Sequence, residues 1–205
     1  MTKEDLYSAV VGCPLFCAGI IRDLDTNIPR GFFTEANAGN RITLMVVGIN
    51  PGQPMESEKR IYNQSTDKDK ANTHFSFARK AYTGAGKTFH RRLLAWLSEI
   101  LEKKPEEVFR EVVYTNLVKC TTPNNKMPSK ELSKTCFAQN LQKEILFWRP
   151  LVIVALGNTC DDMLSELGID HMRLPHPSHR EHATYHFPEV QRIRERLKEG
   201  TAVGA

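Results

Sequence analysis

ITLMVVGINPG, residues 42–52, is a run of apolar residues that ends abruptly in a turn. The continuous stretch Ile42–Val47 indicates a buried central strand, because a strand covered on both faces is apolar throughout. The strand ends at Gly48, and two glycines and a proline then force a tight turn. Val112–Val118 (VVYTNLV) and Leu151–Leu156 (LVIVAL) have the same apolar character. The sequence therefore predicts at least three buried strands.

Helical patterns fill the intervals between these strands. In Thr88–Leu101, leucines recur at spacings of three and four, which places them on one face of a helix. Ser129–Trp148 begins with a serine suited to cap a helix and is closed by Pro150. Asn158–Leu167 and Pro188–Glu199 complete the set. Strands that alternate with helices favour a parallel sheet covered on both faces. We therefore predict an α/β fold of three layers, α/β/α, around a mostly parallel four-stranded sheet.

Length and composition set broad limits. A chain of 205 residues can bury one sizeable core, so we expect a single domain over residues 1–205. With 40% hydrophobic and 25% charged residues, the composition is that of a soluble globular protein. No apolar run approaches the roughly 20 residues of a membrane helix. The first residues are polar and partly acidic, so we expect no secretory signal there. We expect a cytoplasmic monomer without membrane contact.

Two features of the chain are less informative. The net charge of +4 would assist approach to a phosphate backbone only slightly. The stretch Glu56–Thr73 has low hydrophobicity and predicts a long mobile loop, which is either simply solvated or clamps a substrate.

Three polar residues follow predicted strands, where parallel sheets bind their ligands. Asn50 lies in the turn after the first strand, and its amide can both accept and donate, so it could position a water without being a strong base. Asn116 lies in or at the end of the second strand, where an amide needs partners. His176 follows a short apolar segment and could donate to an oxygen that gathers negative charge. Taken singly, each has an ordinary alternative: a turn residue, a structural amide and a surface histidine.

Together these residues resemble the uracil-DNA glycosylase superfamily. Gly48–Gly52 (GINPG) is similar to the first motif of its mismatch-specific branch, and His176–Ser178 (HPS) to the second motif of several branches. Tyr82–Lys87 (YTGAGK) resembles the Phe-Val-Gly-x-x-Gly segment of the iron–sulfur branch. Thr115–Lys126 resembles that branch's segment around Asn-Val-Val-Lys-Cys. The resemblance covers roughly Ile42–Arg180.

The resemblance implies an enzyme that flips a base out of DNA and hydrolyses its bond to the sugar. Asn50 would aim the water, and His176 would steady the charge on the leaving base. Asn116 would read the N3–H and O4 edge of uracil beside Gly48 and Ile49 of the first motif.

Further residues are implied in contacts with the base and the duplex. Tyr82 would stack on the flipped base, although a core aromatic is the alternative. Ser178, His179 and Arg180 would contact the DNA, the last two in the loop that pushes into the duplex.

The first motif differs from that of the iron–sulfur branch, which usually has an acidic residue where this chain has Asn50. Uracil is thus the leading substrate, with hypoxanthine, xanthine or a mismatched base as alternatives. No lysine occupies a motif position, so we expect hydrolysis without strand cleavage. The rival interpretations are a non-catalytic nucleic-acid-binding module of the same fold and a metal-containing structural protein.

Four of the five cysteines suggest a metal site. Cys120 and Cys136 have the fifteen-residue interval of the iron–sulfur branch, and Cys13 and Cys17 form a pair near the N-terminus. That pair has three intervening residues where the branch more often has two. With the resemblance, these thiolates are expected to hold a structural [4Fe–4S] cluster. Zinc would accept the same ligands, and small buried hydrophobes are the alternative without a metal. Cys160 is expected to be a packed thiol.

Overall fold

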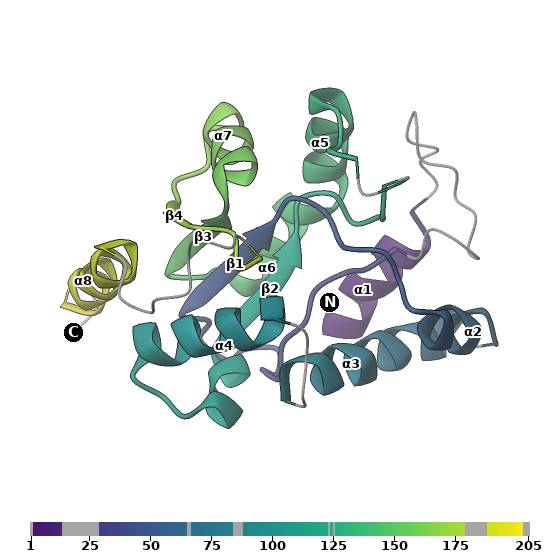
Figure 1. Ribbon diagram of the computed structural model, residues 1–205, viewed down its shortest axis with the longest axis horizontal. Helices are drawn as coiled ribbons and strands as arrows, with labels where there is room; N and C mark the ends of the chain where they lie inside the picture. The colour runs from purple at the N-terminus through teal and green to yellow at the C-terminus, as the bar shows by residue number, and fades with distance from the viewer. Residues whose placement is uncertain are drawn as a thin grey trace.

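The computed structural model describes residues 2–13, 29–64, 67–83, 88–122, 124, 126–178 and 188–202 of the chain. Its centre is a four-stranded sheet with the order β2-β1-β3-β4 (Figure 1). Every pairing between neighbouring strands is parallel. The strands are β1 (Leu44–Gly48), β2 (Val112–Asn116), β3 (Val152–Leu156) and β4 (Met172–Leu174). The predicted α/β fold with a parallel sheet is confirmed.

Helices connect and cover the strands. They are α1 (Lys3–Val11), α2 (Glu56–Gln64), α3 (Asp67–Thr83), α4 (Thr88–Leu101), α5 (Lys130–Cys136), α6 (Gln142–Trp148), α7 (Asn158–Glu166) and α8 (Pro188–Ala202). A 3₁₀ segment, η1 (Pro105–Arg110), precedes β2, and a π-helical segment, η3 (Phe137–Leu141), joins α5 to α6. Within the ranges given above, no helix combines the length and the apolar character needed to cross a bilayer.

The sheet separates two hydrophobic clusters because successive side chains of a strand point to opposite faces. Leu44 and Val46 of β1 join residues of α4, η1 and α8 on one face. Met45 and Val47 join residues of α1, α6 and α7 on the other face. Figure 1 shows α4 below the sheet and α7 above it. The arrangement is the predicted three-layer α/β/α architecture.

Most predicted elements lie where the sequence placed them. Helix α4 has the predicted bounds, and α8 begins at the predicted residue. Ser129 caps α5, since its side chain accepts a hydrogen bond from the backbone N–H of Leu132. The predicted helix Ser129–Trp148 is one rod with a π-turn in its middle. That π-turn has no sequence signature.

The predicted loop at Glu56–Thr73 is wrong. The segment is helical in α2 and in the start of α3, with residues 65 and 66 outside the described part. A polar helix needs few apolar residues when it lies at the surface, and glutamate and lysine are good helix formers. Glu58 anchors α2, because it is buried and both its carboxylate oxygens accept hydrogen bonds from Arg30, at 2.9 and 2.6 Å.

Candidate active site

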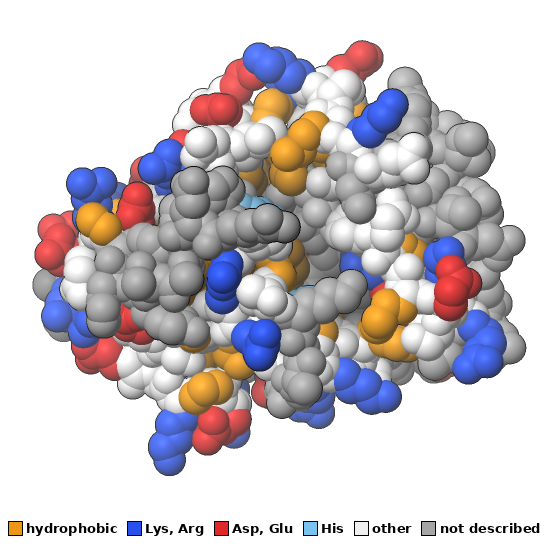
Figure 2. Space-filling model, in the orientation of Figure 1, with side chains coloured by type: hydrophobic (Ala, Val, Ile, Leu, Met, Phe, Trp, Pro, Cys, Tyr) orange, Lys and Arg blue, Asp and Glu red, His pale blue; other side chains and the backbone are white. Residues whose placement is uncertain are grey.

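The carboxyl ends of the strands meet at one edge of the sheet. Gly48 and Asn116, the last residues of β1 and β2, are paired in register. On the other side of β1, the backbone N–H of Gly157 donates to the carbonyl of Leu174, 2.8 Å away. A Cβ at Gly157 would lie 3.2 Å from the Cβ of His176. Figure 2 shows a hollow near the middle of the face over these strand ends, with hydrophobic and histidine side chains visible around it.

Asn116 is the buried amide of this edge. Its side chain is only 3% exposed, and its Oδ1 lies 3.4 Å from the hydroxyl of Tyr114, which donates to it. Burial raises the pKa of Tyr114 to about 12, so the hydroxyl keeps its proton. In the described part of the chain, Nδ2 of Asn116 has no acceptor, so the amide nitrogen is free to donate to a ligand. Glycine at position 48 leaves room for the Asn116 amide, because a Cβ there would lie only 2.7 Å from its Oδ1.

Asn50 lies two residues beyond β1 and is held by a relay of hydrogen bonds. Its Nδ2 donates to the hydroxyl of Thr122 at 2.8 Å, and that hydroxyl donates to the carbonyl of Lys126 at 2.5 Å. Because the hydroxyl proton of Thr122 is committed to Lys126, its oxygen accepts from Asn50 and sets the orientation of the amide. Among the described residues nothing donates to Oδ1 of Asn50, which leaves this oxygen to accept from a water.

His176 follows β4 and is exposed at the same edge. The backbone N–H of Ser178 lies 3.3 Å from its Nδ1 and donates to it. In the neutral imidazole the ring proton is therefore on Nε2, which makes Nε2 a donor. The ring lies 5.4 Å from that of Phe89 on α4. Arg92 of the same helix donates to the carbonyl of Pro177, 3.1 Å away, and so fixes the loop that carries the histidine.

Tyr82 is part of the core. It is 5% exposed, and its ring stacks on Phe33 with centroids 5.5 Å apart and planes 2° apart. Burial raises the pKa of Tyr82 well above its ordinary value. This placement supports the alternative of a core aromatic. The aromatic beside His176 is instead Phe89, whose ring also lies 6.1 Å from that of Tyr114. The position of Phe89 at the start of α4, after the glycine-containing segment, is the sequence feature from which this placement could have been predicted.

The remaining residues predicted to touch base or duplex have different positions. Ile49 is half-buried, packs against the α1/α6/α7 cluster and accepts a hydrogen bond from Val118 at its carbonyl, 2.9 Å away. Ser178 is exposed beside His176. His179 and Arg180 lie outside the described residues.

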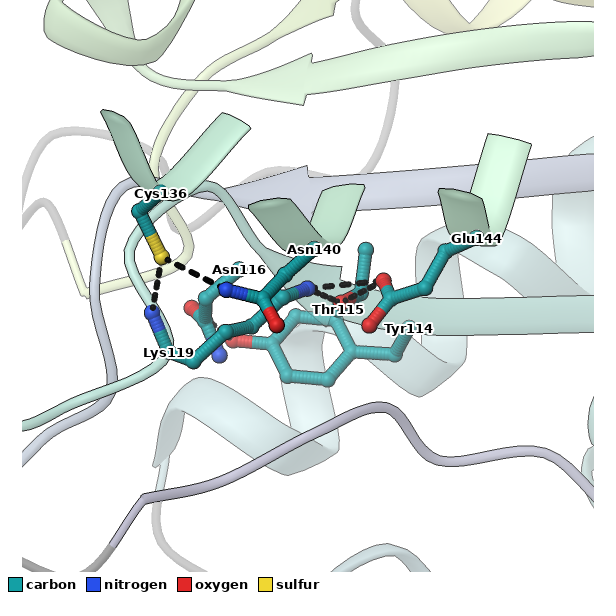
Figure 3. A network of polar contacts seen from close by, with 7 residues as sticks. All are labelled: Tyr114, Thr115, Asn116, Lys119, Cys136, Asn140 and Glu144. Carbon is teal, nitrogen blue, oxygen red and sulfur yellow. Dashed lines mark hydrogen bonds and ion pairs between the residues drawn. The ribbon is translucent and has the colours of Figure 1, made fainter. Parts of the chain in front are cut away.

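Cys136, a predicted metal ligand at the end of α5, is buried. Its Sγ accepts hydrogen bonds from the backbone N–H of Lys119 at 3.3 Å and from Nδ2 of Asn140 at 3.5 Å (Figure 3). Cys120 packs against it in one small cluster, and Cys13 is near enough for its charge to affect the thiol. Burial raises the pKa of Cys136. Donors aimed at the sulfur would suit a metal-bound thiolate, so the contacts of Cys136 fit the role of such a ligand.

The other two cysteines differ from these. Cys17 lies outside the described residues, and the described ones contain no group of three or more histidine, cysteine or acidic side chains placed to hold a metal ion. Cys160 is fully buried, its thiol donates to the carbonyl of Val47 at 3.2 Å, and burial raises its pKa to about 12.

Comparison with known proteins gives one match. The family model of the uracil DNA glycosylase superfamily matches residues 36–198, which covers every element from β1 to β4 and most of α8. A search of curated proteins gave no significant match. The matched stretch spans far more than half of the chain and contains Asn50, Asn116 and His176 at the edge described above. The chain therefore belongs to the uracil-DNA glycosylase superfamily.

Proposed function

We propose that the protein is a DNA glycosylase that flips uracil, or a related deaminated base, out of DNA and hydrolyses its bond to the sugar. The observation that carries the proposal is the meeting of two asparagines and a histidine at one edge of a parallel sheet. Asn116 pairs in register with Gly48, Asn50 follows two residues later, and His176 reaches the same edge from β4. Each of the three offers the hydrogen-bonding atom that the reaction requires.

The reaction would use these atoms in a fixed order. Nδ2 of Asn116 donates to a carbonyl of the flipped base, which selects bases that carry an oxo group there. As the bond from the sugar to the base breaks, its electron pair moves to the base, and Nε2–H of His176 donates to the oxygen that gathers this charge. Oδ1 of Asn50 accepts from a water whose oxygen then bonds to the sugar carbon. One proton of this water stays in the new hydroxyl group of the sugar, and the other passes to solvent. The base anion takes up a proton from solvent, so the products are free base and an abasic sugar.

The state of Lys119 supports hydrolysis without strand cleavage. A strand-cleaving glycosylase needs a free amine to attack the sugar. The side chain of Lys119 is 2% exposed, and its ammonium is bound to Glu144 and Thr115. It is therefore engaged in the protein interior and cannot serve as that nucleophile.

The proposal is tested with a panel of oligonucleotides that contain uracil, hypoxanthine, xanthine or a mismatched thymine, in single and double strands. We expect release of free uracil, with strand cleavage only after alkali. Strand cleavage without alkali would contradict the hydrolytic mechanism. Binding to DNA with no base released from any substrate would indicate a non-catalytic binding module instead.

Gly48→Ala is expected to lower kcat/KM for uracil release by about tenfold or more, since displaced catalytic groups lose rate steeply. The new methyl group would lie 2.7 Å from Oδ1 of Asn116 and 3.2 Å from the Tyr114 hydroxyl, so the amide must move. Gly200→Ala on α8, where a Cβ meets nothing within 4 Å, is the matched control. Equal kinetics for the two variants would show that the amide position is not critical.

We further propose that Cys13, Cys17, Cys120 and Cys136 hold a [4Fe–4S] cluster, with zinc as the alternative occupant. Thiolates are the ligands of such clusters, and the hydrogen bonds from Lys119 and Asn140 to Cys136 suit a bound thiolate. The group would fix loops in place and take no part in base removal. On this proposal it would tie the segment after α1 to the loop that follows Asn116.

Cys120→Ala is expected to remove most of the visible absorption and bound iron from the purified protein, because one of four ligands is lost. Cys160→Ala is the matched control, since this thiol is buried in the main core and bonded to Val47. Iron content and the visible spectrum are measured for both. A Cys120→Ala protein that keeps full iron would exclude Cys120 as a ligand, and a zinc-loaded, colourless parent would identify the other metal.

A further inference from the structure

A buried ion pair lies directly behind the strand end that carries Asn116. The ammonium of Lys119 donates to the carboxylate of Glu144 at 2.7 Å and to the hydroxyl of Thr115 at 2.6 Å. The Thr115 hydroxyl in turn donates to the same carboxylate oxygen, 2.7 Å away. Figure 3 shows that the three groups contact one another between β2 and α6. The proposed reaction uses none of them.

Such a pair is not retained for stability alone. The side chains of Lys119 and Glu144 are 2% and 0% exposed, although lysine and glutamate are almost never fully buried. Removing two charges from water costs several kcal/mol each, and a well-packed apolar replacement is often at least as stable. The position of this pair therefore points to a role in fixing one local conformation.

The π-turn η3 brings the helical partners of this network to one side. Cys136, Asn140 and Glu144 come from α5, η3 and α6 and point to the same side in Figure 3. A regular α-helix would turn two side chains eight residues apart by about 80°. The wider π-turn takes up part of that rotation. The continuous helix α5–η3–α6 therefore binds Lys119 at two points. Cys136 accepts from its backbone N–H, and Glu144 accepts from its ammonium.

The short segment between Thr115 and Lys119 is consequently held at both ends and along its length. At one end Thr115 bonds Glu144, and at the other the backbone N–H of Lys119 bonds Cys136. Between them, Leu117 and Val118 donate to the carbonyls of Gly48 and Ile49 at 2.8 and 2.9 Å. Asn116 lies inside this segment, so its amide is placed by the network.

We propose that Thr115, Lys119 and Glu144 form a positioning network that holds Asn116 against β1 and links the base-reading amide to the Cys120–Cys136 region. The inference rests on the proposed function, since it assigns these residues to the placement of the amide that reads the base. None of the three touches the substrate. They act through Asn116.

Thr115→Val tests the network with little change in shape or charge. Valine removes the hydroxyl but keeps the branched side chain that suits a strand, and the Lys119–Glu144 pair remains. The chain also provides a matched control, because Thr43, Lys103 and Glu111 form a triad of the same residue types at the opposite ends of β1 and β2. Thr43→Val is thus the same change on the far edge of the same strands.

We expect Thr115→Val to lower kcat for uracil release by about tenfold to 100-fold, as for other misplaced groups, with KM nearly unchanged. Thr115→Ser, which restores the hydroxyl, should recover the rate, and Thr43→Val should match the parent. Assays are run well below the Tm of every variant, so that a loss of stability alone leaves kcat unchanged. A Thr115→Val enzyme with the parent kcat would overturn the proposal.

Amide hydrogen exchange gives a second readout that does not depend on activity. We expect Thr115→Val to accelerate exchange at Leu117, Val118 and Lys119 selectively, while Val113 and Tyr114 stay protected. Uniform acceleration across β2, or none, would contradict a positioning role. A parent protein that releases no base would refute the proposed function, whereas the exchange pattern would still decide whether the network fixes this segment.

Discussion

Asn50→Ala will lower the rate of uracil release by about 100-fold or more while DNA binding stays near that of the parent. The reason is the orientation of the amide: Nδ2 is bonded to Thr122, which leaves Oδ1 to hold the attacking water. A water placed and oriented by the enzyme avoids an entropic barrier that a free water must overcome, and misplacement by about 1 Å costs on the order of 10²-fold. Alanine removes the acceptor but no positive charge, and positive charges are what bind the phosphate backbone. Single-turnover kinetics and a binding titration on the same duplex separate the two effects.

Two further variants show whether Asn50 acts through its oxygen. Asn50→Asp keeps an acceptor, so it should retain more activity than Asn50→Ala although it can no longer donate to Thr122. Thr122→Val keeps Asn50 but removes the oxygen that orients it, so it should lose part of the rate. Undiminished base release from Asn50→Ala would remove Asn50 from the mechanism. Loss of DNA binding in step with the rate would reassign it to recognition.

The sheet and its edge could be predicted from the sequence because their signals are local. The apolar run Ile42–Val47 has the pattern of a strand buried on both faces, and β1 lies in the middle of the sheet. Leucine spacing indicated the helix α4, whose bounds agree with the predicted range. Since parallel strands end at one edge, residues that follow them share that edge, which is why Asn50, Asn116 and His176 could be grouped before their positions were known.

Features that depend on distant partners could not be predicted in this way. Helix α2 was not predicted because its buried carboxylate, Glu58, is neutralised by Arg30. That arginine lies 28 residues earlier in the chain, so no local pattern indicates the pair. Tyr82 was assigned to the site by its motif, but its ring stacks on Phe33, which no local pattern indicates. From the sequence alone, Lys119 looks like an ordinary exposed lysine that follows a strand. Its burial follows from Glu144, 25 residues away on α6.

Lys119→Met will lower the free energy of unfolding by about 3–5 kcal/mol, because it leaves the carboxylate of Glu144 in the core without its counter-ion. Glu144 is fully buried, and among the residues that the structure describes its Oε1 has no hydrogen-bond partner. Of the described groups that bond Oε2, only the hydroxyl of Thr115 would remain. Methionine fills a similar volume, so a cavity contributes little to the loss. Denaturant-induced unfolding of parent and variant measures the difference.

The source of that loss can be isolated within the same chain. Lys119→Met combined with Glu144→Gln removes both charges and should recover most of the stability, since a neutral pair costs far less to bury than a lone carboxylate. Lys103→Met breaks the pair of Lys103 with Glu111, whose side chains are 35% and 33% exposed, and should cost only about 0–1 kcal/mol. If Lys119→Met and Lys103→Met were equally destabilising, burial would not be the cause. A double variant no more stable than Lys119→Met alone would show that the lysine's packing, and not its charge, holds the end of β2 in place.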